Sequence, residues 1–134
     1  MEKKYVASKA FLINPQGKVL LLRHTICPDQ MHYVGTWDVP GGRMEEGEHP
    51  LETLKREVFE ETDVICKSKE ILGQRIHPVT GKEMCYVLCD YISGEKIVKD
   101  SEELDMAEWM SPQKIFKVIT STIFQPVKDY LNEL

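Results

Sequence analysis

Hydrophobic positions in the first part of the chain fall in two short runs with a turn between them. The first run, Val6 to Ile13, is rich in strand-forming residues, and the second, Lys18 to Arg23, reads Lys-Val-Leu-Leu-Leu-Arg. The segment Asn14-Pro15-Gln16-Gly17 between them has the residues of a tight turn. The pattern predicts two strands that form a hairpin.

The next stretch of the chain has little periodicity. Residues 24–36 mix histidine, proline, glycine and aromatic residues, so we expect a loop. Trp37 to Val39 predicts a short strand, which Pro40-Gly41-Gly42 should halt. A polar loop is expected from Arg43 to Gly47, before the first helix.

A helical periodicity follows this loop. Leu51, Leu54 and Val58 are spaced i, i+3, i+7 and predict one buried stripe. Pro50 suits the first turn of a helix, because that position has no intrahelical N–H bond to lose. Asp63 suits the end of the helix, since aspartate tolerates the left-handed conformation that is common there. The pattern therefore predicts a helix that begins at residue 50 and ends near residues 62 and 63.

The second half of the chain again shows strand-like runs. The strands that it predicts are Val64 to Lys67, Ile71 to His77, Glu83 to Ile92, Glu95 to Val98 and Glu108 to Met110. Ser111 and Pro112 are residue types that start helices, so a short helix should run to about Lys117. A last helix should cover Pro126 to Asn132. This order predicts an α+β fold in which helices pack on the faces of a mixed sheet.

Length and composition fit one folded domain. The chain has 134 residues, of which 42% are hydrophobic and 29% charged. Its formal net charge is -5 and its lysines and arginines form no long run, which argues against binding to a nucleic-acid polymer. The first residues show no apolar signal segment, and no apolar run approaches the roughly 20 residues of a membrane span. We therefore expect a cytoplasmic protein with no membrane partner.

The four cysteines show no metal-binding motif. Cys27, Cys66, Cys85 and Cys89 contain no Cys-x-x-Cys pair. Cys85 and Cys89 lie four apart in an apolar run, so they would share one face of a strand. We expect buried, reduced thiols, with a disulfide or a zinc site as the alternative.

Three glutamates stand on one side of the expected helix. Glu57, Glu60 and Glu61 fall within an arc of about 100° beside the apolar stripe. Like charges at this spacing repel one another, by about a few tenths of a kcal/mol for each pair. A bound hard cation such as Mg²⁺ would turn the repulsion into attraction, because such ions take oxygen ligands. The alternative is a solvated helix face, which three glutamates on a helix more often form.

Neighbouring residues favour the cation site over the solvated face. Pro40-Gly41-Gly42 lets the backbone approach an ion or a phosphate closely. Arg56 directly precedes Glu57 and could hold a carboxylate with its planar fork of donors. The alternative for Arg56 is a surface pair with Glu52 or Glu60.

The residues around this helix resemble a known motif. Gly42-Arg-Met-Glu-Glu-Gly-Glu48 is followed by seven residues and then by Arg56-Glu-Val-Phe-Glu-Glu-Thr-Asp-Val64. This looks like the Nudix box: Gly, five residues, Glu, seven residues, Arg-Glu, aliphatic, any, Glu-Glu, any, Gly, aliphatic. Every specified position of residues 42–64 matches except Asp63, which stands where the family has glycine. The departure falls at the helix end and alters no expected metal ligand.

The resemblance implies a fold and a reaction. The fold would be a Nudix-type α/β/α sandwich, with a mixed β-sheet between helices and residues 1–134 as one Nudix domain. The reaction would be hydrolysis of a nucleoside diphosphate linked to another group, with Mg²⁺ as the cofactor and Mn²⁺ as the alternative ion. The partner would be a small nucleotide substrate. Many members of the family form homodimers, and the sequence does not decide this point.

The resemblance also implies roles for individual residues. The implied metal ligands are the carboxylates of Glu57, Glu60 and Glu61, the backbone carbonyl of Gly41, and one acid from a later loop, Glu103 or, failing that, Glu102. Glu57 is also a candidate for activating water, and Arg56 would orient Glu57. Glu48 would have a structural role or would contact the metal-binding residues without binding the ion itself.

Three further residues are candidates for binding the substrate. Arg23 ends the second predicted strand, where an arginine contacts phosphate in some relatives. Tyr33 and Asp38 precede the Pro-Gly-Gly turn and could stack on a base or form hydrogen bonds to it. Trp37 could do the same, with packing in the core as the alternative.

Several substrates fit this pattern. A nucleoside triphosphate, oxidised or otherwise non-standard, is favoured because the chain is short and has no added recognition domain. Pro78, 14 residues beyond the box, is a weak indication of ADP-ribose instead. The acidic balance disfavours removal of a cap from RNA. A non-catalytic nucleotide sensor would normally lack the box glutamates, and all three remain here.

Overall fold

The structure is a computed structural model that describes residues 7–24, 37–44, 47–78, 81–95, 104–119 and 125–133. Along the chain its elements are β1 (Ala7–Ile13), β2 (Val19–His24), β3 (Trp37–Asp38), β4 (Gly41–Arg43), α1 (Pro50–Thr62), β5 (Ile65–Ile76), β6 (Glu83–Ser93), β7 (Leu104–Met110), α2 (Pro112–Val118) and α3 (Gln125–Glu133). One helix therefore follows the first four strands, and two helices follow the last three.

One mixed sheet contains these strands. Its order is β3-β2-β1-β6-β5, with β4 also paired to β1 and β7 paired to β2. β1 and β6 run parallel, and the other pairs are antiparallel. β1 is therefore the central strand, which pairs with β2, β4 and β6.

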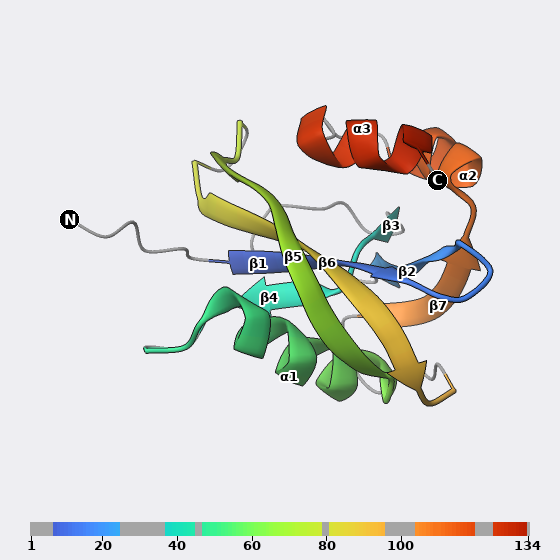
Figure 1. The fold of residues 1–134 in the computed structure, drawn as a ribbon, viewed down its shortest axis with the longest axis horizontal. Coiled ribbons are helices and arrows are strands. Elements are labelled where there is room, and N and C mark those ends of the chain that lie inside the picture. The colour runs from blue at the N-terminus through green and yellow to red at the C-terminus, as the bar shows by residue number, and fades with distance from the viewer. Residues whose placement is uncertain are drawn as a thin grey trace.

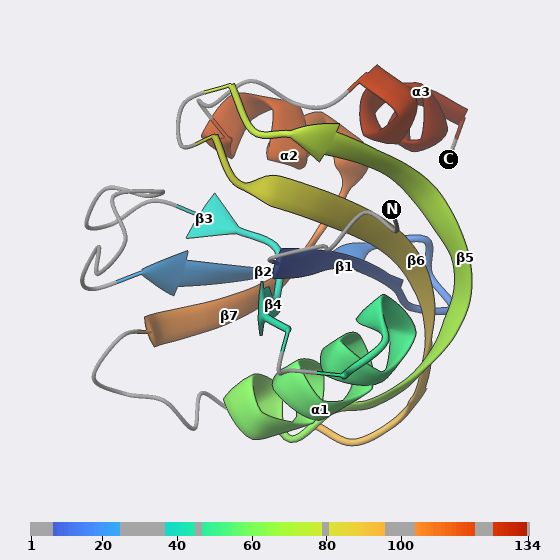
Figure 2. The ribbon, with the colours of Figure 1, turned by 90° about the vertical axis from the view of Figure 1, so that its left-hand side faces the viewer.

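Helices cover both faces of the sheet. Figure 2 shows α1 on one side and α2 and α3 on the other, and Figure 1 shows the same layers from another side. Leu54 and Val58 of α1 pack with Leu12 in one hydrophobic cluster. Ile115 of α2 and Leu131 of α3 pack in a second cluster on the opposite face. This arrangement confirms the expected α/β/α sandwich.

The glycine turn expected after β3 is itself a strand. β3 ends before Pro40, as expected, but Gly41–Arg43 then pairs antiparallel with the start of β1, so the expectations of a turn at Gly41 and Gly42 and of a loop from Arg43 are wrong. Gly41 has φ 153°, and a Cβ at this position would collide with the carbonyl oxygen of Ser8. Adjacent glycines favour a turn in a sequence pattern, but here the missing side chains let β4 lie close against β1.

β5 is a single strand where the sequence predicts two. It runs from Ile65 to Ile76, and its pairing with β6 shifts register between Ser68 and Glu70 and between Ile71 and Gly73. Bulges of this kind break the alternation of inward and outward side chains along a strand. The sequence therefore shows two separate segments although the strand continues through both.

The end of the sheet also differs in its boundaries. β7 begins at Leu104, whereas the sequence predicts only Glu108 to Met110, and Glu95 follows the end of β6 without joining a strand. The remainder of the predicted strand 95–98 and most of the predicted loop 24–36 lie outside the described residues.

Helix α1 has the predicted start and end. Pro50 is its first residue, and the side chain of His49 caps it. It ends at Thr62, and Asp63 adopts φ 66°, in the left-handed region. The Asp63 N–H donates to the carbonyl oxygen of Phe59 at 2.9 Å. Aspartate thus takes the conformation that glycine would take at this helix end.

The described cysteines are buried free thiols, as expected. These are Cys66, Cys85 and Cys89, while Cys27 lies outside the described residues. Burial raises the pKa of the Cys85 thiol to about 11, so this thiol stays protonated at neutral pH. In the described ranges, none of the helices has the length and apolar character needed to cross a membrane.

Candidate active site

Helix α1 lays its glutamates against the glycine strand β4. A Cβ on Gly42 would lie 2.7 Å from Cδ of Glu57, so the carboxylate of Glu57 occupies the place of the missing side chain. Next to it, the N–H of Gly41 donates to Oε1 of Glu61 at 3.2 Å. The glycines of β4 therefore bring the backbone within contact of two of the expected ligands.

Arg56 links the carboxylates into one network. Its Nη1 donates to Oε1 of Glu57 at 3.1 Å and to Oε2 of Glu60 at 3.2 Å. Its Nε and Nη2 each donate to Glu48, both at 3.0 Å. Oε1 of Glu48 also accepts a hydrogen bond from the hydroxyl of Thr53 at 2.7 Å. Glu48 thus fixes the guanidinium, and the guanidinium contacts two of the three helix glutamates.

Glu57 differs electrostatically from an ordinary surface glutamate. Burial raises its pKa, and the positive charge of Arg56 opposes this rise; the negative charges of Glu60 and Glu48 raise the pKa further. Its side chain is 18% exposed, whereas that of Glu60 is 57% exposed. Glu57 is therefore the more enclosed of these two carboxylates, and its raised pKa suits a group that accepts a proton from water.

The donor chemistry of this face fits a hard divalent cation. Carboxylate oxygens and a close backbone are the ligands that such ions prefer. Among the residues described, no three histidine, cysteine, aspartate or glutamate side chains are grouped so that they could hold a metal ion in their present positions. Arg56 and Gly41 hold the carboxylates instead. A cation at this face would therefore draw oxygens from their present hydrogen bonds.

The structure describes the surroundings of two proposed substrate residues, Arg23 and Asp38. Arg23 lies on the same face of β2 as buried residues that face α2 and α3, and its guanidinium lies 6.0 Å from the ring centroid of Trp37. Oδ2 of Asp38 pairs with Nζ of Lys9 at 3.0 Å, and Oδ1 accepts from the N–H of Val39 at 2.8 Å. Trp37 packs against the core, which was the alternative for this residue. Lys9, the partner of Asp38, pairs in the sheet with Gly41, whose N–H donates to Glu61.

The residues around Asp38 were not among the candidates predicted from the sequence. Lys9 is only 8% exposed although it is charged, and Tyr86 lies in the same core layer. Nε of Arg75 donates to the hydroxyl of Tyr86 at 3.0 Å. The signal for Lys9 was available, because it is a lysine in an otherwise apolar strand. Tyr86 and Arg75 carried no such signal.

Three of the candidates cannot be placed. Tyr33, Glu102 and Glu103 lie outside the described residues. They stay predictions from the resemblance.

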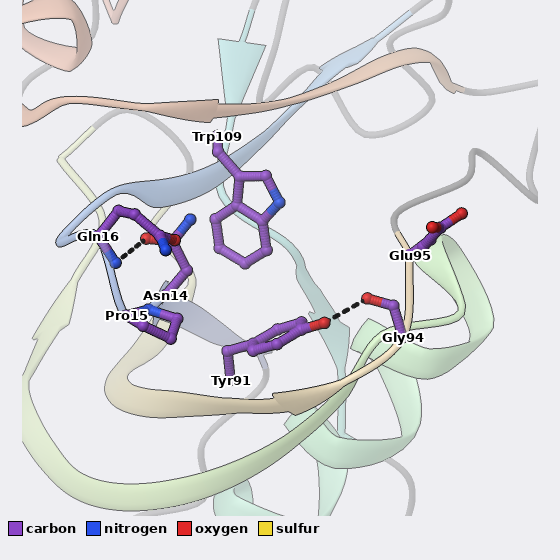
Figure 3. Close-up of a pocket in the computed structure, with 7 residues that line it drawn as sticks. All are labelled: Asn14, Pro15, Gln16, Tyr91, Gly94, Glu95 and Trp109. Carbon is purple, nitrogen blue, oxygen red and sulfur yellow. Dashed lines mark hydrogen bonds between the residues drawn. The ribbon is translucent and has the colours of Figure 1, made fainter.

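A pocket of about 550 Å³ lies elsewhere, between the β1–β2 hairpin and the ends of β6 and β7. Figure 3 shows the aromatic rings of Tyr91 and Trp109 in its wall; their centroids are 5.7 Å apart and their planes lie at 85°. The hydroxyl of Tyr91 donates to the carbonyl of Gly94 at 2.7 Å. None of the candidate site residues lines this pocket. It is therefore distinct from the carboxylate face of α1.

Comparison with known proteins decides the family. The NUDIX domain model matches residues 3–129. The chain belongs to the NUDIX family of hydrolases. The matched range includes residues 42–64, the segment that resembles the Nudix box.

Individual Nudix proteins resemble the chain over different lengths. A putative 8-oxo-dGTP diphosphatase of Bacillus subtilis is 25% identical over 121 residues, which are 90% of this chain and 76% of that protein. The NAD-capped RNA hydrolase NudC of Haemophilus influenzae is 33% identical over 97 residues, 70% of this chain and 34% of that protein. The crystal structure of the MutT protein from Methanosarcina mazei Go1 has a TM-score of 0.69 and 29% identity, and the match covers 99% of this chain and 94% of that one.

The chain spans only part of several relatives. It covers between 20% and 52% of three curated Nudix proteins, NudC among them. Nudix hydrolases act on small nucleotide substrates and generally use divalent metal ions. The named activities of the relatives differ, so family membership alone does not fix the substrate of this chain.

Proposed function

We propose that this Nudix protein is a divalent-cation-dependent pyrophosphohydrolase that acts on a nucleotide, most specifically on a nucleoside triphosphate, oxidised forms included. One observation carries the proposal: Arg56 gathers Glu48, Glu57 and Glu60 on the side of α1 that faces the glycine strand. A solvated helix face would need neither a partly buried Glu57 nor an arginine whose guanidinium is held by Glu48.

The proposed cation site uses the box residues. Glu57, Glu60 and Glu61 would hold Mg²⁺, or Mn²⁺ in its place, together with the carbonyl of Gly41 and with Glu103 from outside the described residues. The ion would neutralise the diphosphate, orient it and lower the pKa of a bound water. What supports these roles is the position of the glutamates against the backbone of β4.

The residues of the chain have their own tasks in this reaction. Glu57 would accept the proton of the attacking water, for which its raised pKa and partial burial suit it. Arg56 would hold the Glu57 carboxylate in place, because Glu48 fixes the plane of its guanidinium. Arg56 is then a positioning residue, and Glu57 the catalytic residue.

Substrate recognition would use Lys9, Asp38 and Arg23. Lys9 pairs in the sheet with Gly41, whose N–H donates to Glu61, so the Lys9–Asp38 pair adjoins the carboxylates through β4. The pair offers a donor and an acceptor to the edge of a base, and Arg23 offers a cation to a phosphate. The name of the Bacillus relative supports an oxidised purine nucleotide as the first substrate to test.

A second candidate is hydrolysis of a capped RNA end. The similarity to NudC over 70% of this chain supports it, and the net charge of -5 opposes it. ADP-ribose is a third candidate, supported only by the position of Pro78. A non-catalytic nucleotide sensor is opposed by the complete set of box glutamates.

One screen with purified protein tests these candidates. The chain with Mg²⁺ is offered canonical and oxidised nucleoside triphosphates, ADP-ribose, dinucleoside polyphosphates, nucleotide sugars and an NAD-capped RNA. We expect a triphosphate, canonical or oxidised, to have the highest kcat/KM and chelation of the cation to abolish turnover. Absence of turnover for every compound, in folded protein, would contradict the enzymatic proposal. If RNA or ADP-ribose had the highest kcat/KM, that compound would replace the triphosphate as the proposed substrate.

Matched variants test the residues. Glu57→Gln and Glu61→Gln should each lower kcat by about two orders of magnitude or more, because each removes a charge at the proposed cation. Glu52→Gln is the control: this glutamate is exposed in the first turn of the same helix. It should leave kcat unchanged. Equal activity of all three variants would contradict the roles of Glu57 and Glu61.

A further inference from the structure

Ser8 has a buried hydroxyl without a hydrogen-bond partner. Its residue is 0% exposed, and its Oγ is the single buried side-chain oxygen or nitrogen of the described residues that lacks a partner. Burying a hydroxyl in this way costs free energy, because the hydrogen bonds to water are lost and not replaced. An alanine would fill the same place without that cost. The hydroxyl therefore calls for an explanation outside the stability of the fold.

Strand register places Ser8 beside Glu57. Ser8 lies on the same face of β1 as Ala10 and Leu12, whose side chains face α1, and it pairs directly with Gly42 of β4. Side chains of directly paired residues lie on the same face, with Cβ atoms about 4.5–5.5 Å apart. Gly42 has no side chain, and the Glu57 carboxylate fills its place, 2.7 Å from where a Cβ would be. Ser8 is thus the cross-strand neighbour of that carboxylate.

The two side chains have complementary needs. Oε1 of Glu57 accepts a hydrogen bond from Nη1 of Arg56 at 3.1 Å. Within the described part of the chain, Oε2 of Glu57 accepts no hydrogen bond and Oγ of Ser8 donates none. A donor without an acceptor and an acceptor without a donor therefore lie side by side on one face of the sheet.

We propose that Ser8 is a positioning residue for Glu57, whose Oε2 receives a hydrogen bond from the Ser8 hydroxyl directly or through one water molecule. Arg56 holds one oxygen of the carboxylate and Ser8 the other, so the carboxylate cannot rotate about its last bond. Support of this kind orients a ligand and tunes its affinity for a metal ion. The inference rests on the proposed function, in which Glu57 binds the cation, and it assigns Ser8 no contact with cation or substrate.

A set of variants at position 8 separates the hydroxyl from the side-chain volume. Ser8→Ala removes the hydroxyl, and Ser8→Thr and Ser8→Val form a pair of equal shape that differs in it. The measurements are thermal unfolding in chelator, Mn²⁺ affinity by calorimetry without substrate, and kcat and KM with Mg²⁺ on the best nucleotide.

We expect loss of the Ser8 hydroxyl to weaken cation binding and turnover without lowering thermal stability. Ser8→Ala should unfold at a temperature close to that of the parent protein, because one hydrogen bond contributes little net to stability and the burial cost of the hydroxyl is removed with it. It should bind Mn²⁺ about tenfold more weakly and have a kcat about tenfold lower at similar KM. Ser8→Thr should bind Mn²⁺ more tightly than Ser8→Val.

Two outcomes would overturn the role of Ser8. One is parental Mn²⁺ affinity and kcat in Ser8→Ala. The other is equal loss in Ser8→Thr and Ser8→Val together with lower thermal stability, which would indicate packing alone. Failure of the proposed function looks different: the parent protein itself would then turn over no nucleotide, whereas the role of Ser8 is judged by Mn²⁺ affinity.

Discussion

Arg56 holds Glu48 through two parallel hydrogen bonds, from Nε to Oε2 and from Nη2 to Oε1, each 3.0 Å long. Both bonds lie in the plane of the guanidinium, so Glu48 fixes that plane. The remaining nitrogen, Nη1, then points at Glu57 and Glu60. Arg56 therefore holds both oxygens of Glu48 and still contacts two helix glutamates.

Arg56→Lys should consequently impair the site although it keeps the charge. A lysine ammonium cannot bond both oxygens of Glu48 and also reach Glu57 in a fixed direction. We expect kcat to fall about 10- to 100-fold with little change in KM. Steady-state kinetics on the best nucleotide measure this, and Lys55→Arg, on an exposed position of the same helix, is the control. Full activity of Arg56→Lys would show that positive charge suffices.

Glu57→Gln should change how stability depends on pH. Because burial raises the pKa of Glu57 above its ordinary value of 4.5, the folded chain binds more protons than the unfolded chain between the two pKa values. The stability of the parent protein should therefore fall as pH rises through this window. Glutamine cannot ionise, so the metal-free variant should unfold at a higher temperature than the parent at pH 7.

Unfolding temperatures measured in chelator from pH 4 to pH 8 check this sign. The advantage of Glu57→Gln should vanish below the ordinary pKa of glutamate, where the parent carboxyl is also protonated. Added Mg²⁺ should stabilise the parent more than the variant, since a ligand stabilises only the state that binds it. A metal-free variant that is less stable than the parent at pH 7 would contradict the direction of the pKa shift.

Local features of the site could be predicted from the sequence. The helix periodicity, the left-handed Asp63 and the shared face of the glutamates all depend on residues close together in the chain. The contact between Arg56 and Glu57 was anticipated for the same reason. For Arg56, the contact with Glu48 adds a partner eight residues away, which the box spacing placed on the same side of the site.

Features that depend on pairing between distant segments could not be predicted. Asp38 and Lys9 are 29 residues apart, and they meet because β1, β2 and β3 are neighbours in the sheet. The place of Ser8 beside Glu57 depends on the register of β4 against β1, and the sequence pattern gave β4 as a turn. Register is set by the whole sheet, whereas a sequence pattern reports only the preferences of each segment.

Gly42→Ala should displace the carboxylate of Glu57. The added Cβ would stand 2.7 Å from Cδ and within 2.9 Å of both carboxylate oxygens, so Glu57 must move. We expect a loss of kcat of about 100-fold, because small misplacements of a reacting group have effects of this order. Kinetics and Mn²⁺ affinity should fall together.

A second glycine supplies the control for Gly42→Ala. Gly81 has φ 71° and open space around the position of a Cβ. Gly81→Ala should cost about 1 kcal/mol of stability through backbone strain and leave kcat unchanged. If both variants lose activity equally, the loss in Gly42→Ala would come from general destabilisation and not from Glu57.

The ion pair between Lys9 and Asp38 leads to a prediction about substrate choice. Asp38→Asn keeps the shape of the side chain and removes its charge. If the pair forms hydrogen bonds to the base, KM for the preferred nucleotide should rise about tenfold, because roughly one hydrogen bond to a charged group is lost. The order of preference among bases should change, while kcat stays close to that of the parent because Glu57 and Arg56 are untouched.

Glu108→Gln is the control: it breaks the more exposed pair between Lys114 and Glu108 and should alter neither KM nor kcat. A uniform fall in kcat for every nucleotide in Asp38→Asn, at unchanged KM, would instead place Asp38 in the support of the fold.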